Sequence, residues 1–250
     1  MKSVSLAKQR LSADPARSRA KGDVIHFEQV SKRYPDSHAG LSEIDLSLRQ
    51  GEMAFLTGHS GAGKSTLLKL IGLLERPSGG QLRVLGRYLN RLAPRQVAAH
   101  RREIGMIFQD NRLLFDRNVF DNVALPLVIR GMAPREIARR VRAALDKTGL
   151  LHKERALPVT LSGGEQQRVG IARAVVAKPP LILADEPTGN LDPGLSRDIM
   201  ALLDEFNQVG VTVLIASHDI ELISTLGKRI LVLEEGRLVY DTANPEGRHD

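Results

Sequence analysis

The chain has 250 residues, a formal net charge of +7 and the composition of an ordinary globular protein, with 42% hydrophobic and 26% charged residues. It contains no cysteine, which excludes a disulfide framework, a cysteine zinc site and a thiol nucleophile. No run approaches the roughly 18 apolar residues that a membrane helix needs, so a role at a membrane would require a partner protein.

The positive charge is concentrated at the amino-terminal end. Six basic residues against one acidic residue give residues 1–22 a formal charge of +5, which leaves +2 for the rest of the chain. The remainder shows no basic stripe with interleaved aromatic residues, so we expect no nucleic-acid partner. The basic composition is therefore a property of a leader segment.

Residues 1–23 are predicted to form a disordered, solvated leader, because low hydrophobicity and high charge do not repay the entropy of ordering. The segment lacks the apolar run of a secretory signal and only weakly resembles an organelle transit peptide. Two other interpretations stay open. Translation could start at Val24, or the leader could be a basic arm held at the anionic inner leaflet, where each Lys or Arg contributes about 1 kcal/mol.

Regular structure is expected from Val24 onward. Residues 24–30 alternate as a half-buried strand does, and residues 44–48 and 53–57 form further expected strands. A glycine-rich loop follows directly, and then an apolar helix is expected over residues 65–74. The order is that of a strand, a loop and a helix.

The pattern turns helical from about residue 93, and we expect a helical subdomain over about 93–178. Pro134 fits a first helical position, ahead of apolar residues at the spacing of one helix face. Short continuous apolar runs at 181–184 and 211–216 are typical of buried parallel strands. A hairpin is expected at 230–240. One domain is expected over residues 24–245, followed by a C-terminal tail over residues 246–250.

The glycine-rich loop matches the phosphate-binding pattern G-x-x-x-x-G-K-[ST], between an expected strand and an expected helix. Glycines let backbone amides turn toward phosphates, and the helix amino terminus adds its positive end. Lys64 is expected to reach the β- and γ-phosphates, and the Ser65 hydroxyl to bind Mg²⁺. The predicted ATP-binding residues of this loop are Gly58, His59, Ser60, Gly61, Ala62, Gly63, Lys64, Ser65 and Thr66.

The strand over 181–184 delivers two carboxylates to its carboxyl end, where ligand sites of α/β sheets lie. Asp185 is expected to hold Mg²⁺ through water. Glu186 is the candidate to polarise the attacking water, because phosphoryl transfer chiefly needs positioning and charge stabilisation. Together with the glycine-rich loop, this pair predicts a nucleoside triphosphatase.

Ser162, Gly163, Gly164 and Glu165 open an expected helix, where a hydroxyl, bare amides and the helix dipole make a second anion site. With Leu161 before it, the segment resembles the signature motif of the ATP-binding-cassette (ABC) ATPases. The resemblance implies an α/β P-loop fold with a parallel core sheet, an antiparallel β-subdomain and a helical subdomain.

Other positions match that family. Gln109 resembles the Q-loop glutamine, which contacts Mg²⁺ and water, and His218 resembles the switch histidine at the γ-phosphate. Tyr34 resembles the aromatic residue that stacks on adenine. The segment that resembles the D-loop consists of Gly189, Asn190, Leu191 and Asp192.

The resemblance also implies the assembly. Two copies would form a head-to-tail homodimer in which each ATP lies between the Lys64 loop of one copy and the Ser162 signature of the other. Catalysis would then involve Glu186, His218 and Gln109, with ATP and Mg²⁺ as ligands. Binding of ATP would close the dimer, and hydrolysis would open it.

Within the ABC ATPases, the segments over 51–71, 120–127 and 207–219 are most similar to the FtsE family of bacterial cell-division proteins. This implies an FtsX-like transmembrane partner, a place on the cytoplasmic face of the inner membrane and activation of septal cell-wall hydrolases, with other cell-division proteins as further partners. Lipoprotein-release and macrolide-efflux ATPases are the alternative within the family. A scaffold of the division complex is an alternative of another class.

A helix of the membrane partner is expected to dock near Gln109 and residues 110–122, where Leu113, Leu114 and Phe115 would offer an apolar seat. Against that role, apolar residues are more often core, and we expect at least two of these three to be buried. Soluble ABC proteins of translation or DNA repair fit less well, because they usually fuse two cassettes or insert a long coiled coil.

Overall fold

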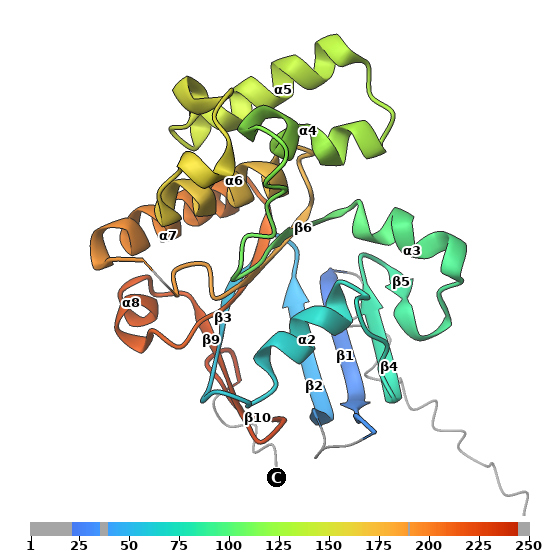
Figure 1. Ribbon diagram of the computed structural model, residues 1–250. Coiled ribbons are helices and arrows are strands. Elements are labelled where there is room, and N and C mark those ends of the chain that lie inside the picture. The colour runs from blue at the N-terminus through green and yellow to red at the C-terminus, as the bar shows by residue number, and fades with distance from the viewer. Residues whose placement is uncertain (1–21, 36–39, 190, 245–250) are drawn as a thin grey trace, which may run out of the picture.

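A computed structural model of the protein describes residues 22–35, 40–189 and 191–244. The expectations for residues 1–21 and the carboxyl-terminal tail therefore lie outside the described residues. Figure 1 shows two sheets with helices between them and a group of helices at one end. The strands are β1 (Asp23–Lys32), β2 (Leu41–Arg49), β3 (Met53–Thr57), β4 (Gly79–Val84), β5 (Arg87–Tyr88), β6 (Ile104–Ile107), β7 (Leu181–Asp185), β8 (Thr212–Ala216), β9 (Arg229–Glu234) and β10 (Arg237–Asp241). The α-helices are α2 (Lys64–Ile71), α3 (Pro94–Arg101), α4 (Val119–Ile129), α5 (Pro134–Lys147), α6 (Gly163–Val175), α7 (Pro193–Gln208) and α8 (Ile220–Thr225), and the short 3₁₀ helices are η1 (Leu89–Arg91), η2 (Leu151–Lys153) and η3 (Pro158–Thr160).

The core of the described region is a six-stranded sheet in the order β10-β9-β3-β8-β7-β6. Its strands β9, β3, β8, β7 and β6 pair in parallel, and only β10 is antiparallel. All residues of β3 and β8 are buried, as continuous apolar runs predict for parallel strands covered on both faces. The expected strands and the β9–β10 hairpin are confirmed.

A second sheet, with the order β2-β1-β4-β5 among the described strands, is antiparallel. The strands expected near residues 24–30 and 44–48 form β1 and β2. The short strands β4 and β5 were not expected, because β4 begins with two glycines and buries only Leu82 and Val84. Helix α2 packs between the two sheets, and its apolar residues share one core with those of β1, β2 and β4.

Helix α2 ends before the expected position at residue 74. Gly72 caps it, and the next residue, Leu73, has a φ of 51°, in the left-handed region that an α-helix does not use. The apolar residues that follow the helix belong to the turn behind it. Apolar periodicity alone therefore placed this boundary too late.

The helical subdomain also differs from the expectation at its start. Helices α4, α5 and α6 pack around their own apolar cluster, whose residues lie between 113 and 177. By contrast, β6 belongs to the core sheet. Val97 of α3 packs against the apolar core that α2 shares with β1, β2 and β4. In Figure 1, α3 lies beside β5. Residues 93–107 are thus part of the core, and the start near 93 was wrong.

The prediction that at least two of the three apolar residues at 113–115 are core is wrong. Leu113 is buried, but 41% of Leu114 and 59% of Phe115 are exposed. The segment is held by Asn122, whose side chain accepts from the Leu114 amide at 2.8 Å and donates to the Leu114 carbonyl at 2.9 Å. This clamp leaves two large apolar side chains at the surface.

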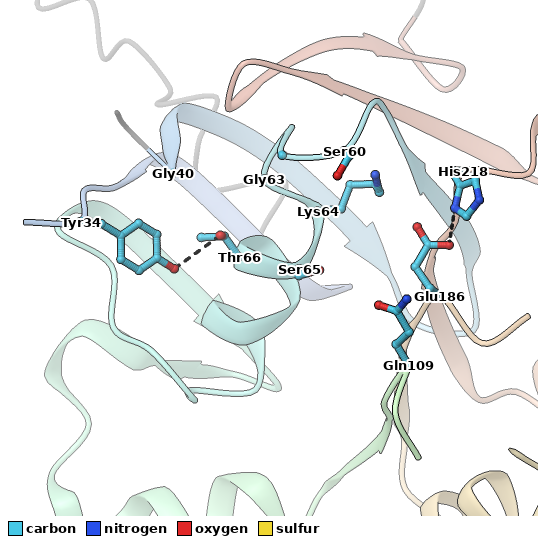
Figure 2. Close-up of a pocket in the computed structure, with 11 residues that line it drawn as sticks. Tyr34, Gly40, Ser60, Gly63, Lys64, Ser65, Thr66, Gln109, Glu186 and His218 are labelled. Carbon is cyan, nitrogen blue, oxygen red and sulfur yellow. Dashed lines mark hydrogen bonds and ion pairs between the residues drawn. The ribbon is translucent and has the colours of Figure 1, made fainter. Parts of the chain in front are cut away.

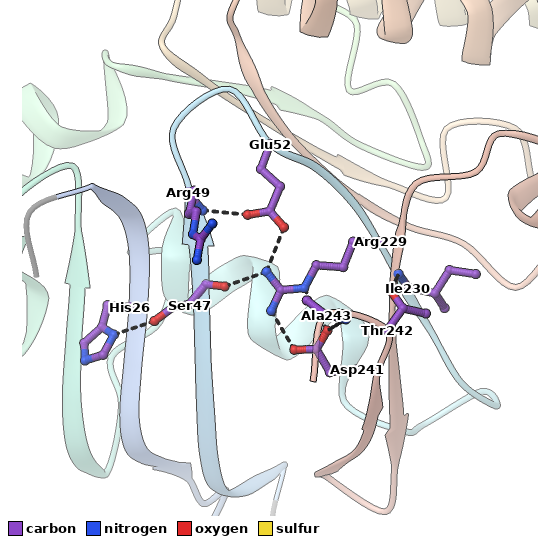
Figure 3. A network of polar contacts seen from close by, with 9 residues as sticks. All are labelled: His26, Ser47, Arg49, Glu52, Arg229, Ile230, Asp241, Thr242 and Ala243. Atoms are coloured by element: carbon purple, nitrogen blue, oxygen red, sulfur yellow. Dashed lines mark hydrogen bonds and ion pairs between the residues drawn. The ribbon is translucent and has the colours of Figure 1, made fainter. Parts of the chain in front are cut away.

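A buried polar network joins the two sheets at Arg229 (Figure 3). The guanidinium donates to both carboxylate oxygens of Asp241 at 2.8 and 2.6 Å, to Glu52 at 2.8 Å and to the backbone carbonyl of Ser47 at 2.8 Å. Burial opposes the charged form, but the hydrogen bonds to Asp241 and Glu52 outweigh it, and the pKa of Arg229 is raised. Arg229 thus connects β9 and β10 with β2 and the start of β3.

We expect Arg229→Met to destabilise the protein by about 3–5 kcal/mol, because it removes one partner of a largely buried ion-pair network, together with the hydrogen bonds to Asp241, Glu52 and Ser47. Arg237→Met is the matched control: that arginine is half exposed and lies 3.8 Å from Glu43, so it contributes at most about 1 kcal/mol. Urea unfolding curves measure both. Equal unfolding midpoints for the two variants would show that the network contributes little.

Candidate functional site: a nucleotide pocket

A pocket of about 730 Å³ opens where the antiparallel sheet meets the core sheet. Figure 2 shows Lys64, Glu186 and His218 pointing into it, with Tyr34 at the opposite side. It is lined by Tyr34, Gly40, Ser60, Gly61, Gly63, Lys64, Ser65, Thr66, Gln109, Glu186 and His218. Sequence positions from 34 to 218 therefore meet in one place.

The parallel sheet explains this convergence. The register pairs Leu56 of β3 with Ala216 of β8, Asp185 of β7 with the same Ala216, and Ile107 of β6 with Ala184. The strands therefore end at a common edge, and the residues that follow them lie together. The edge receives the glycine-rich loop after β3, Gln109 after β6 and Glu186 after β7, together with His218 after β8.

Close packing of the glycine-rich loop explains two of its glycines. Gly58 has a φ of 141°, and a Cβ there would lie 2.1 Å from the backbone oxygen of Leu233. Gly63 has a φ of 104°, and a Cβ there would lie 2.7 Å from the carbonyl oxygen of Gly40. Any larger residue would push the loop away from both sheets, so the loop keeps its shape only with glycine at these positions.

The Lys64 side chain lies along the loop. It is 8% exposed, and its ammonium group donates to the carbonyl oxygens of Gly58 at 2.7 Å and His59 at 3.1 Å. Gly58, His59 and Ala62 are not among the residues that line the pocket, and their contact with ATP stays a prediction. The ammonium group is thereby held at the pocket wall, where it can meet phosphate oxygens.

Ser65 and Asp185 lie where the sequence placed the metal ligands. The Ser65 hydroxyl donates to Asp185 Oδ1 at 3.0 Å, and Gln109 lines the same pocket. Hydroxyl, carboxylate and amide oxygens suit Mg²⁺, which is bound through few protein ligands together with substrate phosphates. The residues therefore fit the ion, whose charge would neutralise the phosphates, and their role as ligands stays a prediction.

Glu186 and His218 form a pair in the pocket. His218 Nδ1 lies 2.8 Å from Glu186 Oε2, and the backbone amide of Glu186 donates to Ala216 at 2.9 Å. Glu186 has a φ of 48°, a left-handed conformation that costs a non-glycine residue of the order of 1–3 kcal/mol and is concentrated at functional sites. The strand pairing holds this carboxylate in a fixed place, as its expected role toward water requires.

Tyr34 reaches the pocket from the antiparallel sheet. Its hydroxyl lies 3.4 Å from the Thr66 hydroxyl, and the Lys32 ammonium lies 4.9 Å from the ring centroid. Burial raises the pKa of Tyr34, so its hydroxyl stays protonated at neutral pH. Gly40 also lines the pocket and was not predicted, because it comes from the other sheet and has no motif around it.

If Tyr34 stacks on the base, Tyr34→Ala should raise the KM for ATP about 10-fold or more with kcat changed less than about two-fold, since stacking contributes about 1–3 kcal/mol per base. Tyr34→Phe is the matched control, because it keeps the ring and loses only the hydroxyl, with its contacts to Thr66 and Glu75. Steady-state kinetics measure both variants. A normal KM for Tyr34→Ala would remove Tyr34 from the binding site.

The signature residues lie outside this pocket. Ser162 is the N-cap of α6: its hydroxyl accepts from the Glu165 amide at 3.3 Å, and Glu165 accepts from the Ser162 amide at 2.8 Å. These hydrogen bonds, above all that from the Ser162 backbone amide, lower the pKa of Glu165, with Lys153 3.6 Å away. Ser162 and Gly163 are exposed at a helix amino terminus, as residues that bind a ligand of another copy must be.

The expected D-loop is partly described. Asn190 lies outside the described residues. Leu191 packs against the core sheet cluster, and Asp192 caps α7 by accepting from the amides of Gly194 and Leu195 at 2.9 and 3.0 Å. The Asp192 carboxylate thus has a structural role here, and a contact with a second copy stays a prediction.

The pocket is that of a nucleotide-binding cassette, and the chain belongs to the ABC transporter family: residues 41–189 match the family model described as "ABC transporter". It is 60% identical to the cell division ATP-binding protein FtsE of Escherichia coli over 86% of this chain and 97% of that protein. It is 42% identical to FtsE of Bacillus subtilis over 91% of this chain and all of that protein.

A solved structure supports the class. The dimeric post-hydrolysis state of the ATP-binding cassette MJ0796, bound to ADP and phosphate, has a TM-score of 0.81 and 34% identity, over 87% of this chain and 97% of that one. The predicted ABC fold is thus confirmed. The protein is an ATPase of the ABC type, and cassettes of this type form dimers.

Proposed function

We propose that this protein is the ATP-hydrolysing subunit of an ABC complex in bacterial cell division. The observation that carries the proposal is its 60% identity to the E. coli cell division protein over 97% of that protein's length. Sequence identity over nearly the whole length of a relative supports a shared role better than a shared motif does. Lipoprotein release and macrolide efflux remain the alternatives within the family.

The proposal includes a transmembrane partner of the FtsX kind and a place on the cytoplasmic face of the inner membrane. None of the helices among the described residues is both long and apolar enough to cross a membrane. Force on the membrane would therefore pass through a protein contact. ATP-driven closure of two copies would change the distance between their partner-binding surfaces, and hydrolysis would reverse it.

The surface for that contact is an apolar groove of about 600 Å³ between α3, β6 and α4. Phe108, directly before Gln109, lines it together with Leu125 and Ile129 of α4, and Arg101 and Arg130 add positive charge. A short amphipathic helix with an acidic residue suits such a groove. The groove includes Phe108, so its occupant would contact the residue next to Gln109.

The experiment that tests the function is purification of the tagged chain from native membranes, followed by identification of the co-purifying membrane protein. Recovery of an FtsX-like protein supports the division role. Recovery of a lipoprotein-release or efflux permease instead would overturn it. Cells that contain Glu186→Gln separate a motor from a scaffold: the motor requires turnover and predicts blocked septation, whereas normal septation would favour the scaffold.

We expect Ile129→Glu to abolish co-purification of the membrane protein, because Ile129 is 59% exposed and lines the groove. Val209→Glu is the control, since Val209 is 78% exposed at the end of α7 and outside the groove. The ATPase rate of the isolated chain should be unchanged in both variants. Full recovery of the partner with Ile129→Glu would place the contact elsewhere.

A further inference from the structure

An arginine of the signature helix binds the turn that follows Gln109. Arg173, on α6, donates to the backbone carbonyl of Arg112 at 2.7 Å and also to that of Asn111. Its guanidinium is partly buried beside the groove, and burial lowers its pKa. Hydrogen bonds of a desolvated charge to oriented carbonyls are stronger than those of an exposed one.

The turn that Arg173 holds is conformationally costly. Asn111 has a φ of 53° and Arg112 a φ of 45°, so two successive non-glycine residues lie in the left-handed region. Asparagine adopts this conformation at a lower cost than arginine does, and residues held in it persist where their surroundings stabilise them. Without Arg173 the turn would relax, and the chain after Gln109 would change direction.

Two further contacts fix the same turn. The Arg112 guanidinium stacks over the Phe108 ring, 4.1 Å from its centroid. On α6, a Cβ added at Gly170 would lie 3.5 Å from Asn111 Oδ1, so the asparagine side chain lies directly on the helix surface there. Gly170 and Arg173 are three residues apart and share one face of α6. The turn is therefore seated on the signature helix.

The signature residue Ser162 caps the start of α6, eleven positions before Arg173, and a helix is about 1.5 Å long per residue. Arg173 therefore lies roughly 16 Å from the signature along one rigid element. We propose that Arg173 is a positioning residue for ATP hydrolysis: it holds the Asn111–Arg112 turn and thereby sets the place of Gln109 relative to the signature helix. The inference rests on the ATPase activity and not on the role in cell division.

A double-mutant cycle tests this positioning role in the full-length protein. Arg173→Met should lower kcat about 10-fold or more, because displacing a catalytic group by about 1 Å can cost as much as 100-fold, while KM for ATP changes less than about two-fold. In a Gln109→Ala background the same substitution should lower kcat less than about two-fold, because there is no glutamine left to position.

The controls separate positioning from stability. Arg139→Met removes an arginine that is 75% exposed on α5 and should change neither constant in either background. Arg173→Lys keeps the charge but lacks the planar fork for two carbonyls, so an intermediate kcat is expected, and it replaces Arg173→Met if that variant does not fold. An equal loss of kcat in both Gln109 backgrounds, or no loss at all, would overturn the proposal.

Discussion

Glu186→Gln should lower the rate of ATP hydrolysis by about 100-fold or more and leave ATP binding nearly unchanged. The substitution keeps the shape of the side chain and removes the negative charge that polarises the attacking water, and a general base contributes about 10²–10⁴ in rate. Glu186 lies 2.8 Å from His218, and the Gln variant can keep that hydrogen bond. Single-turnover hydrolysis together with equilibrium ATP binding measures the two effects separately.

Glu234→Gln is the matched control, since Glu234 is exposed at the end of β9 and outside the pocket. It should hydrolyse ATP at the normal rate. A normal rate for Glu186→Gln as well would show that another group activates water. His218 is the next candidate, because it is the other member of the pair and lines the same pocket.

Lys64→Ala should weaken ATP binding by about 100-fold or more. The Lys64 ammonium is held at the wall of the pocket by two loop carbonyls, and among the described residues no other side chain that lines the pocket carries a fixed positive charge. Its loss leaves the phosphates with backbone amides and the helix dipole, which are weaker partners than a charge-assisted hydrogen bond. Titration of the full-length protein with a fluorescent ATP analogue measures the dissociation constant.

Lys69→Ala controls for loss of charge on the same helix. Lys69 is 45% exposed, lies 3.9 Å from Glu75 and does not line the pocket, so its removal should not change the dissociation constant. ATP binding of normal affinity by Lys64→Ala would contradict the assignment of the loop. Together, the two pairs of variants assign binding to Lys64 and turnover to Glu186.

Much of the core could be predicted because the signals are local. The apolar runs of β3, β7 and β8 are buried on both faces, and each is followed directly by a polar motif, so the strand and its functional residue are read together. The pattern predicts that these ends share one edge of a parallel sheet. The structure brings Lys64, Gln109, Glu186 and His218 to one pocket accordingly.

The features that the sequence did not reveal depend on distant contacts. Gly40 lines the pocket only because the second sheet folds back onto the glycine-rich loop, and β4 pairs with β1 although it buries just two side chains. The exposure of Leu114 and Phe115 results from the Asn122 clamp, which apolar character alone does not indicate. The left-handed turn at 111–112 likewise has its carbonyls bound by Arg173, 61 residues further along the chain.

We propose that each ATP site is completed by the signature of a second copy. The most direct measurement is the mass of the Glu186→Gln protein in solution by light scattering, with ATP and with ADP. A dimer with ATP and a monomer with ADP are predicted, and adding Ser162→Arg should abolish the dimer while Lys64 still binds ATP. A monomer that holds ATP, or a dimer that is indifferent to Ser162→Arg, would contradict the claim.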